Sequence, residues 1–101
     1  MKSYGGVTSP YGMAFGDFNR DGVTDVVVSS SADSYLKVYT GNTNGSFDLP
    51  DAYAAGTNPY FVHVTDFNSD GFDDLISESG GGTIDVFLGN GDGTFLARKS
   101  Y

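Results

Sequence analysis

Two short stretches of the chain carry oxygen-bearing side chains at alternating positions. They are DFNRDGVTD at residues 17–25 and DFNSDGFDD at residues 66–74, which begins 49 residues further along. In a tight loop every second side chain can turn inward around one ion, and calcium prefers six to eight oxygen ligands in a flexible shell. Carboxylates crowded in this way repel one another unless a cation lies between them. The repeated spacing therefore predicts one calcium site in each stretch.

The predicted ligands occupy matching positions in the two loops. Positions 1, 3, 5 and 9 offer side-chain oxygens, position 6 is a glycine that permits a sharp turn, and position 7 offers its backbone carbonyl. The first set is Asp17, Asn19, Asp21, the carbonyl of Val23, and Asp25, and the second is Asp66, Asn68, Asp70, the carbonyl of Phe72, and Asp74.

Other interpretations of the loops fit less well. An EF-hand needs a bidentate glutamate at position 12, where this chain has Val28 and Ser77, and strand-like residues follow both loops. Magnesium demands a stricter octahedron, and zinc prefers histidine or thiolate ligands, which the loops lack. Asp, Asn and Gly also form ordinary turns without any metal. The second copy, in phase with the first, disfavours this alternative.

The loops belong to a longer duplication that divides the chain into residues 1–52 and 53–101. GNTNGSF at 41–47 is answered by GNGDGTF at 89–95. Each unit contains four short runs rich in β-branched and aromatic residues between glycine and asparagine turns. Repeats of this period with four strands are typical of propeller blades. The sequence thus predicts an all-β fold of two four-stranded antiparallel blades, with strands at 12–18, 25–30, 35–41 and 46–54, then 61–67, 74–79, 83–89 and 94–101.

The strand patterns also predict which side chains face a neighbouring blade. The run DVVV at 25–28 is expected to be buried on both faces, and alternation places Leu36, Val38, Ile84 and Val86 toward a neighbour, with Lys37 and Asp85 facing away. Two blades leave two outer faces uncovered. Either the chain is an excerpt of a longer one, or copies of it join head to tail into a closed ring with an even number of blades, helped by the N-terminal SYGG.

Composition and charge narrow the range of partners and activities. Thirteen acidic against five basic residues give a net charge of −8, which argues against nucleic acid and anionic membranes. The chain has no cysteine for disulfides, no apolar run of signal-peptide type, and no segment long enough to span a bilayer. No catalytic base, nucleophile and orienting group can be assembled around the single histidine, His63. We therefore do not expect the chain to be an enzyme. Tyr11 and Tyr60 suit either contact with a ligand or packing between blades.

Residues 12–30 and 61–79, with the GNGDGTF-type turn, resemble FG-GAP (VCBS) repeats of integrin α-subunit propellers and secreted bacterial proteins. They are more distantly similar to propeller lectins of the Psathyrella type. FGD at 15–17 matches the Phe-Gly of the family, whereas the second copy has VTD. The resemblance implies calcium between the first and second strands of each blade, held by the two ligand sets given above. It also implies an extracellular module for binding or adhesion, with glycans or an extracellular protein as partner. The alternative is an engineered or excerpted repeat pair that serves as a structural or protein-interaction scaffold and binds no ligand beyond calcium.

Overall fold

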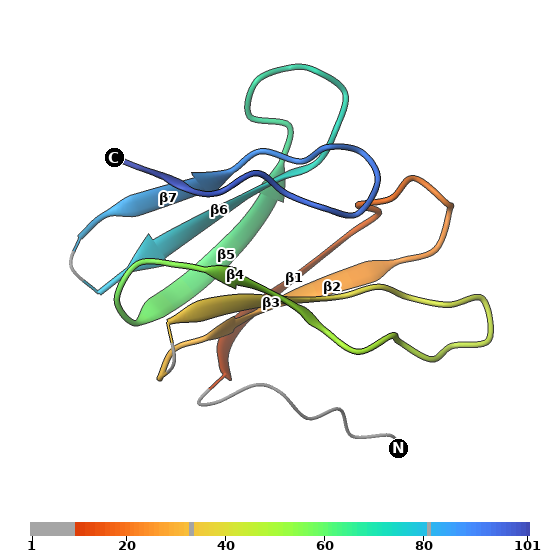
Figure 1. Ribbon diagram of the computed structural model, residues 1–101, viewed down its shortest axis with the longest axis horizontal. Coiled ribbons are helices and arrows are strands. Elements are labelled where there is room, and N and C mark those ends of the chain that lie inside the picture. Colours follow the sequence, from red (N-terminus) through yellow and green to blue (C-terminus); the bar gives the residue numbers. More distant parts are fainter. Residues whose placement is uncertain (1–9, 33, 81) are drawn as a thin grey trace.

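The computed structural model describes residues 10–32, 34–80 and 82–101 and contains two four-stranded antiparallel sheets (Figure 1). We call them blade 1 and blade 2, and in both the strands are adjacent in chain order. Blade 1 consists of β1 (Pro10–Gly16), β2 (Asp25–Ser30), β3 (Tyr35–Tyr39) and β4 (Asp51–Ala54), and blade 2 of β5 (Pro59–Thr65), β6 (Asp74–Ser79), β7 (Ile84–Phe87) and β8 (Lys99–Ser100). The predicted all-β fold with two such sheets is confirmed. In the described ranges, no helix is long and apolar enough to cross a membrane.

The two sheets pack against each other, with β1 of blade 1 lying beside β5 of blade 2 (Figure 1). Blade 1 contributes Val27, Leu36 and Val38 to the shared core. Blade 2 contributes the buried side chains of Leu75 and Phe87, among others. The predicted burial of Leu36 and Val38 is therefore confirmed, and so is that of the DVVV run, in which every residue is buried.

The predicted orientation of β7 is wrong at two positions. Ile84 is 45% exposed, whereas the side chain of Asp85 is fully buried. Burial of Asp85 is possible because its carboxylate accepts hydrogen bonds from the backbone N of Gly56 at 2.7 Å and the hydroxyls of Ser79 and Ser100 at 3.2 and 2.5 Å. Asp85 thus ties the connection between the blades to blade 2.

Several predicted strand ends are also wrong. The first strands begin at Pro10 and Pro59 and stop before the acidic loops, rather than spanning 12–18 and 61–67. The outer strands are much shorter than 46–54 and 94–101, because near Phe47 and Phe95 the pairing is reduced to isolated bridges with Gly41 and Gly89. The expected pairing of the N-terminal SYGG lies outside the described residues.

Candidate metal centre

Each acidic loop forms the corner between the first and second strands of its blade. The backbone follows the same course in both loops: Gly22 and Gly71 have φ of +82° and +86°, and Arg20 and Ser69 both have φ of +59°. Glycine adopts this left-handed region without steric cost, which explains its presence at position 6. The two loops thus present their side chains in the same order toward the inside of the turn.

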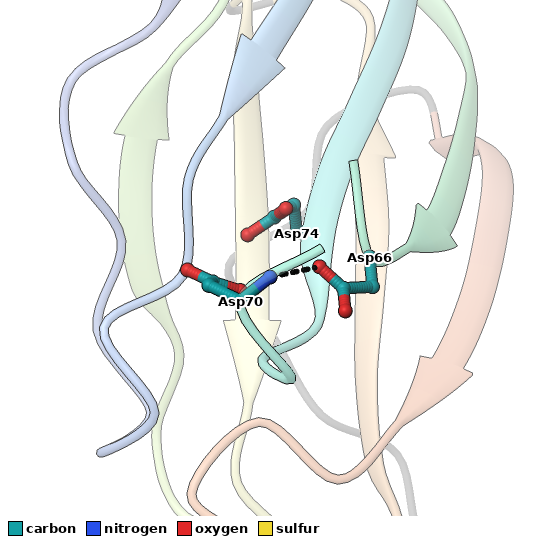
Figure 2. Close-up of side chains that lie close together, drawn as sticks. All are labelled: Asp66, Asp70 and Asp74. Carbon is teal, nitrogen blue, oxygen red and sulfur yellow. Dashed lines mark hydrogen bonds between the residues drawn. The ribbon is translucent and has the colours of Figure 1, made fainter. Parts of the chain in front are cut away.

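Hydrogen bonds inside the second loop aim its carboxylates inward. Asp66 accepts from the backbone N of Asp70 at 3.1 Å and of Gly71 at 2.9 Å, and the first of these bonds is drawn in Figure 2. Asp70 in turn accepts from the backbone N of Phe72 at 3.0 Å. The turn is therefore folded around its own acidic side chains.

The buried carboxylate of Asp74 links three strands of blade 2. It accepts from the backbone N of Phe67, beyond the end of β5, at 2.8 Å, and from that of Gly89, beyond the end of β7, at 2.7 Å. Gly89 must be glycine here, because a Cβ at this position would collide with the carbonyl oxygen of Asp73. Each carboxylate oxygen has two lone pairs, so Asp74 keeps acceptor capacity for a cation.

The acidic groups of the second loop come together at one point. Asp66, Asp70 and Asp74 each offer a carboxylate oxygen, and these oxygens all lie within 4.8 Å of one another (Figure 2). The amide of Asn68 faces the same group: with its nitrogen inward it donates to Asp70 at 3.0 and 3.2 Å and to Asp74 at 3.3 Å. With its oxygen inward it adds a fourth oxygen to the cluster.

The first loop repeats these bonds with closely similar distances. Asp17 accepts from Asp21 N and Gly22 N at 3.1 and 2.9 Å, and Asp21 accepts from Val23 N at 2.9 Å. Asp25 is buried. Its carboxylate accepts from the backbone N of Phe18, at position 2 of the loop, at 2.8 Å, and from that of Gly41, after β3, at 2.9 Å. Of the two loops, only the second gathers its three carboxylates within 4.8 Å.

One buried acceptor in the first loop fits a bound cation. The Oδ1 of Asn19 is buried, and the described part of the chain gives it no hydrogen-bond donor. A buried acceptor left without a partner costs about 1–3 kcal/mol, so such atoms usually have a partner. A cation in the loop would provide one for Asn19, at the position that corresponds to Asn68.

The donor set of both loops fits a hard cation. It consists of carboxylate and amide oxygens, the ligands that calcium prefers, and it includes no histidine or thiolate. The structure therefore brings the predicted side chains of each loop to one turn. The predicted use of the Val23 and Phe72 carbonyls stays a prediction.

Blade 2 supports the first loop through contacts that were not predicted from the sequence. The carboxylate of Asp73 lies 3.4 Å from the backbone N of Asp17, and Gly93 N donates to the carbonyl of Phe18 at 3.0 Å. The guanidinium of Arg20 lies 5.3 Å from the centre of the Phe72 ring. The one signal in the sequence was the repeat itself, because Phe72, Asp73 and Gly93 lie within the matched motifs of blade 2.

The other candidate residues lie away from the loops. His63 Nε2 lies 3.2 Å from a carboxylate oxygen of Glu78, and both side chains are exposed. Tyr60, at the start of β5, is 37% exposed. The side chain of Tyr11 lies outside the described part of the structure.

Two stacked four-stranded blades, each with an Asp-x-Asn-x-Asp-Gly corner, define a propeller-type repeat with an oxygen-lined loop. The profile of the FG-GAP-like repeat matches residues 17–77, more than half of the chain. The chain therefore belongs to the FG-GAP-like repeat family, and the resemblance seen in its motifs is confirmed. Comparisons with curated proteins and with solved structures give no match.

Proposed function

We propose that this chain is a calcium-binding blade pair that acts as an extracellular module for binding or adhesion. The observation that carries the proposal is the convergence of Asp66, Asp70 and Asp74 within 4.8 Å, together with the buried Asn19 Oδ1 that has no donor in the described residues. In each loop the side chains at positions 1, 3, 5 and 9 would hold the ion. The ion would neutralise the crowded carboxylates and stabilise the folded corner.

Within this class we propose glycans as the ligand, bound through several blades at once. The exposed Tyr60 supports this, because a tyrosine offers a flat apolar ring beside a hydroxyl. Multiple weak sites on one assembly raise the overall avidity. The proposal assigns the chain no catalytic role.

The second candidate is a scaffold that binds calcium and other protein surfaces only. Large apolar side chains on the outer faces of the blades favour it: Met13 and Phe15 of β1 are both 59% exposed, and Phe61 of β5 is 52% exposed. The same exposure supports self-association, and we propose that copies join head to tail into a ring with an even number of blades.

Calorimetric titration of the chelator-treated chain with calcium and with magnesium tests the proposal. We expect two calcium ions per chain and weaker binding of magnesium, which demands a stricter octahedron. Asp66→Asn should remove one ion, whereas the matched change Asp92→Asn, outside both loops, should leave two. No heat of binding at millimolar calcium would refute the calcium site, and a glycan array without hits would leave the scaffold as the function.

A further inference from the structure

Blade 2 has an open hollow beside its acidic loop. It has a volume of about 140 Å³ and is lined mainly by apolar residues, namely Phe67, Val86, Leu88, Leu96, Ala97 and Tyr101, together with the polar Asn68 and Lys99. A cavity of this size takes a benzene ring. Phe67 is 53% exposed at this position, which leaves much of its ring uncovered.

The matching place in blade 1 is filled by an aromatic ring from blade 2. Phe18, Val38 and Tyr53 correspond in the repeat to Phe67, Val86 and Tyr101. Phe95 packs edge-on against Phe18 and Tyr53, with ring centroids 5.3 and 5.5 Å apart. Phe18 is consequently only 4% exposed. The junction inside the chain thus shows what fills a hollow of this kind.

The residue of blade 1 that corresponds to Phe95 is Phe47. It ends the GNTNGSF motif as Phe95 ends GNGDGTF, and both pair with the first glycine of their motif. Phe47 is half-buried against the outward face of its own blade, formed by Val26, Val28 and Tyr39. Blade 1 therefore presents outward the same aromatic element that blade 2 uses at the internal junction.

We propose that a second copy of the chain docks head to tail and places its Phe47 in the hollow formed by Phe67, Val86 and Tyr101. Gly45 is expected to take the role of Gly93, whose backbone N donates to the carbonyl of Phe18 at 3.0 Å. In the single chain Gly45 N donates to Asn42 O at 3.1 Å, so it changes acceptor to the Phe67 carbonyl on docking. This inference rests on the proposed self-association and names the residues that carry it.

The two junctions differ at the first strand of each blade. Gly12 and Ala14 of blade 1 lie at the internal junction. The corresponding residues on the outward face of blade 2 are Phe61 and His63. A Cβ at Gly12 would lie only 2.7 Å from the carbonyl oxygen of Tyr60, so that junction is tight. The larger side chains keep a docked copy further away at its first strand. The distance between the two copies is therefore expected to be larger near β5 than at the hollow.

Cation binding and docking are expected to reinforce each other through charge. Each chain carries a net charge of −8, and two bound calcium ions, with two positive charges each, bring it to −4. Repulsion between copies scales with the product of their charges, so it falls about fourfold when both loops are filled. The partner also covers Phe67, which is part of the second loop.

Sedimentation of the full chain over a range of concentrations, in calcium and in chelator, tests the interface. Phe67→Asp places a carboxylate in the hollow and should raise the concentration for half-association at least about 10-fold, whereas Phe67→Leu, which keeps it apolar, should change it less than about 3-fold. Thermal unfolding and calcium titration of each variant separate loss of association from loss of fold or ion.

Two results would overturn the inference, and a third would overturn only the proposed cation site. A chain that stays monomeric at all concentrations in calcium removes self-association altogether. Association that Phe67→Asp leaves unchanged keeps self-association but places the interface elsewhere. Absence of bound calcium in a chain that still associates through Phe67 refutes the cation proposal and leaves the docking surface intact.

Discussion

Substitution of Asp70 by asparagine distinguishes a cation site from an ordinary turn. The Asp70 carboxylate accepts from the backbone N of Phe72 at 3.0 Å, and an asparagine oxygen can accept the same bond. The turn itself should therefore survive. What changes is the charge next to Asp66 and Asp74, whose oxygens lie within 4.8 Å of those of Asp70.

The sign of the effect depends on calcium. Two unit charges 4–5 Å apart in water interact by about 1 kcal/mol, and salt reduces this, so without calcium Asp70→Asn should be neutral or stabilising by at most about 1 kcal/mol. Calcium at 100 times its dissociation constant stabilises each site by about 2.7 kcal/mol. If the lost carboxylate weakens binding about 100-fold, only about 0.4 kcal/mol of the calcium stabilisation remains, so about 2.3 kcal/mol is lost. After the gain from relieved repulsion is subtracted, the variant should be less stable in calcium by about 1.3–2.3 kcal/mol.

Thermal unfolding followed by circular dichroism, in chelator and in calcium, measures this difference. In a domain of this size 1 kcal/mol shifts Tm by about 4–8 °C. In calcium we therefore expect the Tm of the variant to be about 5–18 °C below that of the unmodified chain, whereas in chelator it should not be lower. Asp92→Asn is the matched control, since Asp92 accepts from Thr94 N at 3.0 Å in a turn of the same kind. Equal effects of the two substitutions in both buffers would refute a cation at Asp70.

Three further predictions concern the contacts that support the loops and the junction. Gly89→Ala should destabilise the chain by about 1–3 kcal/mol in denaturant unfolding, because the added Cβ collides with the Asp73 carbonyl; an unchanged midpoint would contradict this. Phe95→Ala should lower the free energy of unfolding by about 3–5 kcal/mol, since the ring is buried against Phe18 and Tyr53. A loss smaller than that caused by the same substitution at an exposed phenylalanine would exclude a role of Phe95 at the junction. Burial raises the pKa of Tyr53 above its usual 10.0, so the neutral hydroxyl is favoured in the folded state and stability should fall as pH rises above about 10 toward the raised pKa. Tyr53→Phe should reduce this alkaline loss in a pH series of unfolding midpoints, and an unaltered series would refute the assignment.

The sheets and loops could be predicted because their signals are local and occur twice. Leu36 and Val38 alternate with polar residues, and both are buried. The loops carry their turn chemistry in their own sequence, since the aspartates accept hydrogen bonds from backbone groups two to five residues further on. The repeat then excludes a chance pattern, because the second loop forms the same bonds.

What the sequence could not determine depends on contacts between distant segments. Alternation in the run Ile84–Phe87 is compatible with either face being buried. The outcome is set by Gly56, Ser79 and Ser100, which provide the donors that make burial of Asp85 possible. No local pattern reveals such donors, because they come from the blade connection and from two other strands.

The acidic loops affect more than their own turns because each lies where several strands end. Asp74, in β6, accepts hydrogen bonds from Phe67 N and Gly89 N and so connects the ends of β5 and β7. An ion bound to Asp74 would therefore stabilise a connection between three strands. At the internal junction the Phe18 carbonyl, within the first loop, accepts from Gly93 of the next blade. Ordering a loop therefore also orders the surface on which the following blade packs. Cation binding and blade stacking are for this reason expected to be coupled, whether the next blade belongs to the same chain or to a second copy.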